Sequence, residues 1–232
     1  MPPAICLDTN DTIVFIGDSI TDADRHHPAY APLGRGYVHF AANSLLATYP
    51  HLNLRITNTG IGGDTILDLQ RRWETDCLSH EPSVLSVLIG INDAWYLTTP
   101  SGGNGKAAPP EQYEVTYDQL LLQAKNRCDC QIVLIEPFVF SADPQSQLLS
   151  TAKPYIAIVR KLATKYGAVL VALQEHINKQ IKQVPLGAMG RRYGAPSRMG
   201  TRLDRAALAG SHRFVTQMSR AKKTLSHLRR CR

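Results

Sequence analysis

The sequence predicts an α/β fold: a three-layer α/β/α sandwich with a central parallel sheet. Short apolar runs recur along the chain, and amphipathic segments separate them. The runs are mostly apolar throughout, which is typical of strands buried on both faces of a parallel sheet. Strands and helices that alternate at this spacing form βαβ units. With 232 residues, the chain is expected to contain one domain with a full-sized core.

Each expected strand is one of the apolar runs, and each expected helix is an amphipathic segment that follows a run. In chain order, the strands are expected at Thr12–Ile16, Leu52–Asn58, Val84–Ile89, Gln131–Glu136 and Ala168–Ala172. The helices are expected at Tyr37–Ala47, Thr65–Cys77, Pro110–Ala124, Thr151–Tyr166 and Gln174–Lys182. The sequence contains no internal repeat.

The composition is that of a soluble globular protein, with 44% apolar and 19% charged residues. No apolar run approaches the ~20 residues of a membrane span, and the first residues lack the basic and apolar regions of a signal peptide. The five cysteines are odd in number, and Cys128 and Cys130 are separated by a single residue. Neither a disulfide framework nor a metal site is therefore expected. These features favour a cytoplasmic protein.

The charge is unevenly distributed along the chain. From residue 185 onward there are ten arginines and two lysines against one aspartate, a formal charge of +11, whereas residues 1–184 carry −4. Such a contrast needs an explanation of its own. We expect residues 1–184 to form the domain and residues 185–232 to be a basic, aberrant tail.

Polar segments follow the first three expected strands: GDSITD (17–22), NTGIGGDT (58–65) and IGINDAWY (89–96). In α/β sheets, ligands bind beyond the carboxyl ends of the strands. A serine nucleophile needs a base, and it needs donors directed at the developing oxyanion. Ser19 could attack while its own N–H donates, and the side-chain amide of Asn92 could donate to the same oxygen. The glycines between them permit a turn that presents another N–H.

Each of these segments also has an ordinary explanation. Serine and aspartate are preferred helix N-caps, glycine-rich turns are common, and an asparagine after a strand is often a turn residue. Ser19 is therefore either a nucleophile on a strand-to-helix turn or the cap of the next helix. The occurrence of all three segments in this order, each at a strand end, favours the nucleophile.

The segments resemble sequence blocks of the SGNH (GDSL) hydrolase family, which contains bacterial esterases and lysophospholipase-like enzymes. FIGDSITD resembles its nucleophile block, NTGIGGDTILDL its glycine block and GINDAW its asparagine block; IEPFVF and KYGAVLVALQ resemble later segments. The similarity runs from Asp11 to Lys182. It implies that Ser19 is the nucleophile and first oxyanion-hole donor, that Gly63 is the second donor and that Asn92 is the third.

The resemblance further implies a flavodoxin-like sheet and the hydrolysis of a carboxylic ester through an acyl-enzyme, with no metal or organic cofactor. The implied partner is a small-molecule acyl or acetyl ester. Acetylated sugars, short-chain esters, thioesters and lysophospholipids are all accepted somewhere in the family. We expect the pocket walls to come from the 97–110 loop, Trp95, Tyr96 and Phe138.

The family's fourth block is missing from this chain. That block, Asp-x-x-His-Pro near the C-terminus, supplies the orienting acid and the general base, but no Asp-x-x-His occurs after Asn92. The tail contains two histidines, His212 and His227. His212 is the better candidate for a base, although the preceding acid, Asp204, lies eight residues before it.

A frameshift would explain both the missing block and the basic tail. Methionine has a single codon, so Met189 and Met199, each followed by glycine, both become tryptophan in the +1 frame. The codon pairs that start at residues 191 to 196 can then encode Asp-Asp-Met-Val-His-Pro, and Met218 yields a stop codon if Ser219 is encoded AGC or AGT. The alternative is a natural, divergent basic tail.

Without the base and the acid, the chain is expected to keep its nucleophile and oxyanion hole but to be a severely impaired esterase. Two other functions stay open. One is a non-catalytic ligand-binding module on a hydrolase scaffold. The other is nucleic-acid binding through the tail, which is disfavoured because Tyr193 and Phe214 are the tail's only aromatic residues other than histidine. Nucleic acid is therefore not the expected partner.

Overall fold

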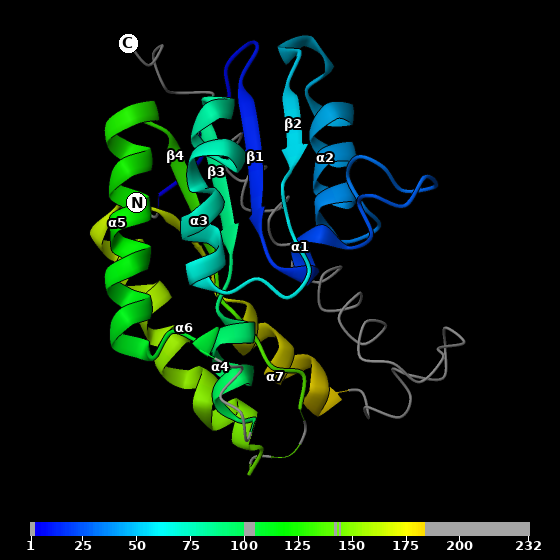
Figure 1. Ribbon diagram of the computed structural model, residues 1–232. Coiled ribbons are helices and arrows are strands. Elements are labelled where there is room, and N and C mark those ends of the chain that lie inside the picture. Colours follow the sequence, from blue (N-terminus) through cyan, green and yellow to red (C-terminus); the bar gives the residue numbers. More distant parts are fainter. Residues whose placement is uncertain (1–2, 100–104, 142, 144, 184–232) are drawn as a thin grey trace.

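The computed structural model describes residues 3–99, 105–141, 143 and 145–183. Its centre is a five-stranded sheet in the order β2-β1-β3-β4-β5, and every pair of neighbouring strands is parallel (Figure 1). The strands are β1 (Thr12–Gly17), β2 (Arg55–Asn58), β3 (Val84–Leu88), β4 (Gln131–Ile135) and β5 (Val169–Val171). The predicted parallel sheet is confirmed.

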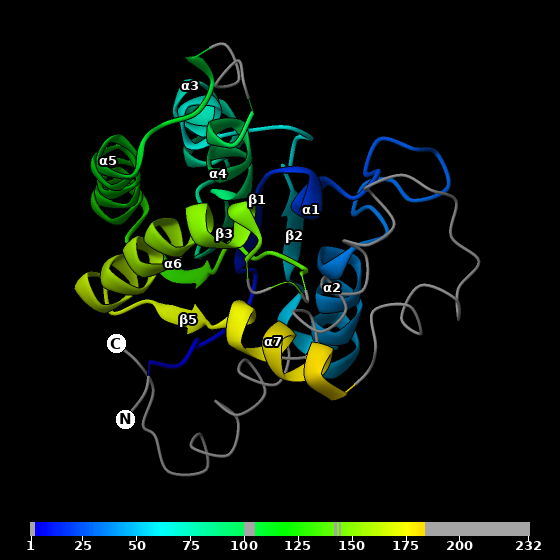
Figure 2. The same ribbon diagram turned by 90° about the horizontal axis from the view of Figure 1, so that it is seen from below.

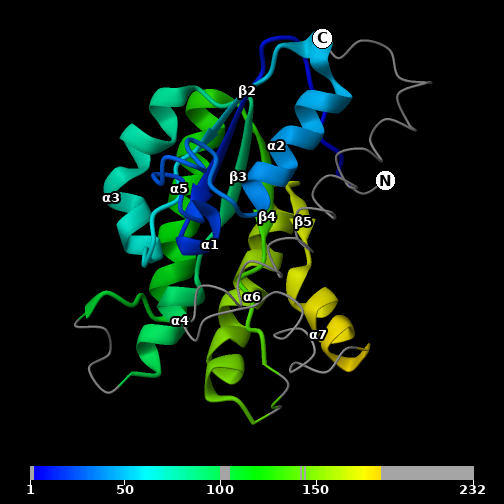
Figure 3. The same ribbon diagram turned by 90° about the vertical axis from the view of Figure 1, so that its right-hand side faces the viewer.

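Helices cover both faces of the sheet, so the predicted three layers are present (Figures 2 and 3). One face is covered by α3 (Ile66–Asp76), α5 (Pro110–Cys128) and α6 (Gln147–Lys165), and the other by α2 (Tyr37–Thr48) and α7 (Leu173–Gln183). A hydrophobic core lies between the sheet and the helices on each face. In β1, Val14 and Ile16 pack in the core on the side of α3, α5 and α6, whereas Ile13 and Phe15 pack in the core on the side of α2 and α7. Successive side chains of a strand point to opposite faces, so an entirely apolar strand supplies both cores.

Two short helices begin directly beyond strands at the carboxyl edge of the sheet, which faces the viewer in Figure 2. Helix α1 (Ser19–Asp22) follows β1, and α4 (Ile91–Leu97) follows β3. The chain then continues from β1 to α2 on one face, and from β3 to α5 on the other. Adjacent strands whose connections leave to opposite faces create a crevice between their ends, where this class of sheet binds ligands.

The observed strands agree with the predicted ones to within one residue at each end, except for β2. This strand begins at Arg55 rather than at Leu52. The residues before it form the 3₁₀ helix η1 (Pro50–Leu52), and Asn53 then adopts a left-handed backbone conformation with φ of 49°. The turn delays the start of the extended segment.

The observed helices differ more from the prediction. Helix α6 begins at Gln147 rather than at Thr151, because the Ser146 side chain caps it by accepting a hydrogen bond from the Leu149 N–H. Helix α5 continues to Cys128, beyond the predicted end. The short helices α1, α4, η1 and η2 (Leu78–His80) were not predicted.

Within the described residues, no helix is both long and apolar enough to cross a membrane. The predicted basic tail, residues 185–232, lies outside the described residues.

Candidate active site

Ser19 is the first residue of α1, two positions after the end of β1. The N-cap of this helix is Asp18, whose Oδ1 accepts a hydrogen bond from the Ile20 N–H at 2.9 Å. Ser19 is thus not the cap. Its half-buried side chain has no hydrogen-bond partner among the described residues. The hydroxyl therefore lies at the carboxyl edge of the sheet, and within the described part of the chain it makes no hydrogen bond that would stabilise the fold.

The glycine-rich loop after β2 lies against α1. The Ile61 N–H donates to the carbonyl oxygen of Gly17 at 3.0 Å, and the Gly62 N–H donates to Asp22 Oδ2 at 3.2 Å. A Cβ atom on Gly62 would lie 3.9 Å from the Cβ of Ser19. These contacts place the loop directly beside Ser19. The next residue, Gly63, has a φ of +87°, in the left-handed region that favours glycine.

Asn92 lies in the first turn of α4, and its side chain is held against the same loop. Its Nδ2 donates to the carbonyl oxygen of Asp64 at 2.9 Å. One turn further along, the Tyr96 hydroxyl lies 3.9 Å from the position that a Cβ of Gly63 would take. The structure thus brings the three residues singled out in the sequence together, because Ser19 and Asn92 both lie against the loop that carries Gly63.

Three N–H donors remain at this place. Among the described residues, neither the backbone N–H of Ser19 nor that of Gly63 donates to a protein atom. The Asn92 amide has two hydrogens, of which the bond to the loop uses one. Unused N–H donors on a serine, on the loop beside it and on a helix that contacts this loop are suited to stabilising a developing oxyanion.

Arg72 of α3 holds this edge of the sheet together, and the sequence did not predict its role. Its guanidinium donates to the carbonyl oxygens of Thr59 (2.6 Å) and Gly17 (3.0 Å), and to Asp64 Oδ2 (2.7 Å). The side chain is only 13% exposed. It therefore links the end of β1, the residue after β2 and the loop that Asn92 contacts. In the sequence it is one of two adjacent arginines in an amphipathic helix, so no pattern distinguishes it.

Two fully buried carboxyl groups lie close to the site, on Asp18 and Asp93. Burial raises the pKa of each carboxyl to about 7, although the hydrogen bonds that they accept act in the opposite direction. Asp93 accepts from the backbone N–H groups of Ile66 and Ala108, both at 3.2 Å. It thereby ties α4 to the start of α3 and to the segment before α5. The Oδ2 of Asp18 has no partner within the described part of the chain.

A base for Ser19 is not apparent from the contacts of the described residues, among which no histidine is hydrogen-bonded to its hydroxyl. His27 packs on Tyr30 in the exposed loop after α1, and His39 is exposed on α2. His212, the candidate from the sequence, lies outside the described residues. Within residues 3–99, 105–141, 143 and 145–183, no group of three or more histidine, cysteine or acidic side chains is arranged to hold a metal ion.

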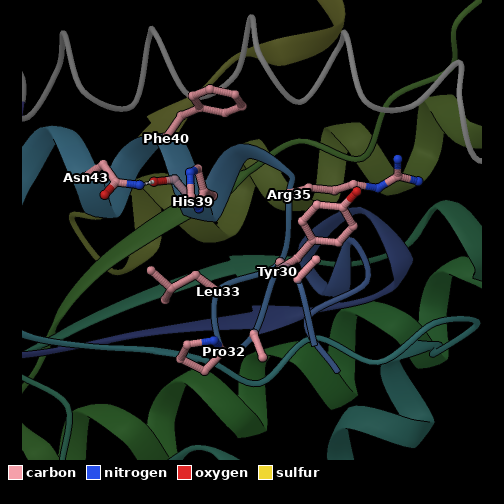
Figure 4. Close-up of a pocket in the computed structure, with 10 residues that line it drawn as sticks. Tyr30, Pro32, Leu33, Arg35, His39, Phe40 and Asn43 are labelled. Atoms are coloured by element: carbon pink, nitrogen blue, oxygen red, sulfur yellow. Dashed lines mark hydrogen bonds between the residues drawn. The ribbon is translucent and has the colours of Figure 1, made fainter. Parts of the chain in front are cut away.

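A pocket of about 350 Å³ lies between the loop after α1 and helix α2 (Figure 4). The labelled side chains that line it are those of Tyr30, Pro32, Leu33, Arg35, His39, Phe40 and Asn43. Ser19, Gly63 and Asn92 do not line this pocket.

The prediction that Phe138 forms a wall of the substrate pocket is wrong, because this side chain is 1% exposed and packs in the core between the sheet and α2. Trp95, by contrast, is 37% exposed.

The sheet and the three segments at its carboxyl edge have the arrangement of an SGNH hydrolase. Residues 15–193 match the family described as GDSL-like lipase/acylhydrolase. The chain therefore belongs to the GDSL-like lipase/acylhydrolase family, and the resemblance seen in the sequence is confirmed.

Its relatives include an esterase of known structure. An acetylxylan esterase from Geobacillus stearothermophilus is 33% identical over 180 residues, which are 76% of this chain and 82% of that protein. The crystal structure of an acetylxylan esterase from Geobacillus stearothermophilus matches the present structure with a TM-score of 0.75 and a sequence identity of 32%. The match covers 89% of this chain and 96% of the esterase chain. An α/β hydrolase enzyme from the metagenome of Lake Arreo, Spain, has a TM-score of 0.74 at 26% identity, covering 89% and 97%.

Crystal structures of the Geobacillus esterase include catalytic mutants in which a serine, an aspartate or a histidine is replaced by alanine. The aspartate and the histidine are three positions apart in that protein. This is the Asp-x-x-His spacing that does not occur after Asn92 in the present chain.

Proposed function

We propose that this fold hydrolyses a carboxylic ester with Ser19 as the nucleophile, and that the ester is an acetyl group on a sugar. The observation that carries the proposal is that unused donors lie on the segments that meet beside Ser19. An unengaged hydroxyl, the backbone N–H groups of Ser19 and Gly63 and the amide of Asn92 lie at one edge of the sheet. The choice of a sugar acetate is supported by the relative from Geobacillus, an acetylxylan esterase.

In the proposed reaction, Ser19 Oγ attacks the carbonyl carbon of the ester while a general base accepts the hydroxyl proton. The carbonyl oxygen becomes an oxyanion and accepts hydrogen bonds from Ser19 N–H, Gly63 N–H and the Asn92 amide. The sugar hydroxyl leaves with the proton, and the acetyl group stays on Ser19. Water then attacks the acetyl carbon, acetate leaves and the serine hydroxyl is regenerated.

The chain as written lacks an identifiable base and orienting acid, so this form of the protein is a severely impaired esterase. Loss of triad members costs roughly 10⁴–10⁶ in kcat, whereas roughly 10³–10⁴ over the reaction in water can survive from binding and the oxyanion hole. The defect lies in residues 185–232, which are a frameshifted reading of the family's C-terminus.

The distance along the chain supports the frameshift. In the Geobacillus esterase the catalytic aspartate follows the catalytic serine by 176 positions. In the +1 frame, the aspartate of the restored Asp-x-x-His is encoded at the position of Arg192, which follows Ser19 by 173 positions. Sequencing the gene around the codons for residues 184–189 tests this part of the proposal directly. A reading frame incompatible with the +1 codons would refute it.

The test of function is the hydrolysis of p-nitrophenyl acetate by two purified proteins, the chain as given and a chain that carries the +1-frame C-terminus. Ser19→Ala versions of both are the controls. We expect the restored protein to be active, its Ser19→Ala version to be inactive, and the chain as given to be slower by at least three orders of magnitude.

Each other outcome removes one part of the proposal. If the restored protein is inactive, or is active without Ser19, the esterase mechanism is wrong. Sugar-acetate binding without hydrolysis or labelling of Ser19 would then support the non-catalytic binding module. If the chain as given is fully active through Ser19, a base comes from elsewhere, with His212 as the first candidate, and the frameshift is wrong.

A further inference from the structure

Helix α4 carries a large aromatic side chain that is open to solvent next to the proposed site. Trp95 is 37% exposed, whereas the other tryptophan of the chain, Trp73, is 2% exposed. The two residues before Trp95, Asp93 and Ala94, are fully buried, so the helix itself is firmly packed. A partly exposed indole ring on a fixed helix is suited to stacking against a ligand.

The position of Trp95 on α4 directs it to the same region as Asn92. Residues three and four positions apart share one face of a helix, so Trp95 and Tyr96 lie on the side of Asn92. Asn92 donates to the Asp64 carbonyl oxygen at 2.9 Å, and the Tyr96 hydroxyl approaches the Gly63 position to 3.9 Å. This face of α4 therefore borders the glycine loop beside Ser19.

Trp95 and Tyr96 form a continuous aromatic surface. Their ring centroids are 5.0 Å apart, with an interplanar angle of 48°. The surface begins with a phenol hydroxyl at the oxyanion-hole loop and ends with the open indole.

We propose that Trp95 is the sugar-binding residue of the site, and that it stacks on the apolar C–H face of the pyranose ring whose acetyl group is presented to Ser19. The inference rests on the proposed function and adds the means by which the alcohol part of the ester is recognised. A pyranose has an apolar face for the indole and rim hydroxyls for polar neighbours such as Tyr96. A fatty acyl chain offers no hydroxyls, and it requires an enclosed apolar site to remove its surface from water.

The direct test uses tryptophan fluorescence, because Trp73 is shielded from solvent and Trp95 is not. The full chain with Ser19→Ala, which cannot consume the ligand, is titrated with an acetylated xylo-oligosaccharide in the presence of acrylamide as a collisional quencher. We expect saturation with the sugar to lower the quenching constant at least twofold. The same protein with Trp95→Phe reports only Trp73, and its quenching constant is expected to stay unchanged.

Binding is then measured by calorimetry for two further variants in the same background. Trp95→Ala is expected to raise the Kd of the oligosaccharide at least tenfold. Phe40→Ala is the matched control, because Phe40 is an aromatic side chain of similar exposure, 43%, that lines the pocket beside α2. Its Kd is expected to stay within twofold of the parent. A larger effect at Phe40 than at Trp95 would place the sugar in that pocket and overturn the proposal.

Two further results would also overturn it. One is an unchanged quenching constant at saturating oligosaccharide. The other is protection of Trp95 by lysophosphatidylcholine, below its micelle concentration, that equals or exceeds protection by the sugar. Hydrolysis of p-nitrophenyl acetate by the protein with the restored C-terminus separates this inference from the esterase proposal. Hydrolysis without protection of Trp95 refutes only the proposed stacking of Trp95 on the sugar. Protection without hydrolysis refutes only the proposed esterase activity.

Discussion

At Gly60, the loop after β2 passes so close to α1 that a side chain has no room. A Cβ there would lie 2.3 Å from the backbone nitrogen of Asp22 and 2.6 Å from the carbonyl carbon of Thr21. A Cβ on Gly62, two residues further on, would meet nothing closer than 3.6 Å. The same loop therefore contains one glycine that the packing requires and one that it does not.

Gly60→Ala is expected to lower the free energy of unfolding by at least about 2 kcal/mol, because backbone atoms of α1 or of the loop must move. Gly62→Ala is the control and is expected to change it by no more than about 0.5 kcal/mol. Urea unfolding followed by circular dichroism measures both. Equal effects of the two substitutions would contradict the close approach seen at Gly60.

Helix α3 shows how one element positions a site to which it contributes no reacting group. Its N-terminus is fixed by a capping box between Thr65 and Asp68. In its second turn, Arg72 donates to the carbonyl oxygens of Thr59 and Gly17 and pairs with Asp64. These bonds reach β1, the end of β2 and the loop beside Ser19. The helix thus acts as a brace across the carboxyl edge of the sheet.

We expect Arg72→Met to destabilise the fold by about 3 kcal/mol, because it leaves a poorly exposed carboxylate and two carbonyl oxygens without their donor. Arg71→Met is the matched control. Arg71 is the adjacent residue, but its side chain is 69% exposed, so the substitution is expected to cost no more than about 0.5 kcal/mol. Thermal unfolding of the two variants compares them. A loss at Arg71 equal to that at Arg72 would show that the bonds of Arg72 do not brace the sheet.

The stability of the whole molecule is linked to pH through Asp18 and Asp93. Burial raises the pKa of both carboxyl groups to about 7 in the folded protein, from an ordinary value of 3.8. Between these pH values the folded state keeps protons that the unfolded chain has released. Stability from these two groups is therefore greatest below about pH 4, falls as the pH rises to about 7, and changes little above that.

We expect the parent protein to be less stable at pH 8 than at pH 5, by up to about 3 kcal/mol for each carboxyl that titrates, because about two pH units separate pH 5 from the raised pKa. Asp18→Asn and Asp93→Asn remove a titrating group while keeping an oxygen that accepts the backbone hydrogen bonds. Each variant is therefore expected to show a flatter dependence. Urea unfolding at pH 5, 6, 7 and 8 measures it. A pH dependence as steep in both variants as in the parent would show that these carboxyls are not the cause.

The sequence was sufficient to predict the order of the strands and the longer helices along the chain, the parallel sheet and the three polar segments at the carboxyl edge of that sheet. Each of these follows from local patterns: apolar runs, amphipathic periodicity and a motif directly after a strand. It was not sufficient for the short helices at strand ends. Helix α4 has only seven residues, too few for its periodicity to stand out.

The tertiary structure decided which residues meet, and that information is absent from any local pattern. Asp18 rather than Ser19 caps α1, because its carboxyl oxygen lies within reach of the Ile20 N–H. Arg72 stabilises the carboxyl edge of the sheet by donating a hydrogen bond to the carbonyl oxygen of Gly17, which lies 55 positions earlier in the chain. The raised pKa of Asp18 arises only because folding surrounds it with protein and removes water. Contacts between distant segments and the loss of solvent around a group are created by packing, and so they become visible only in the folded chain.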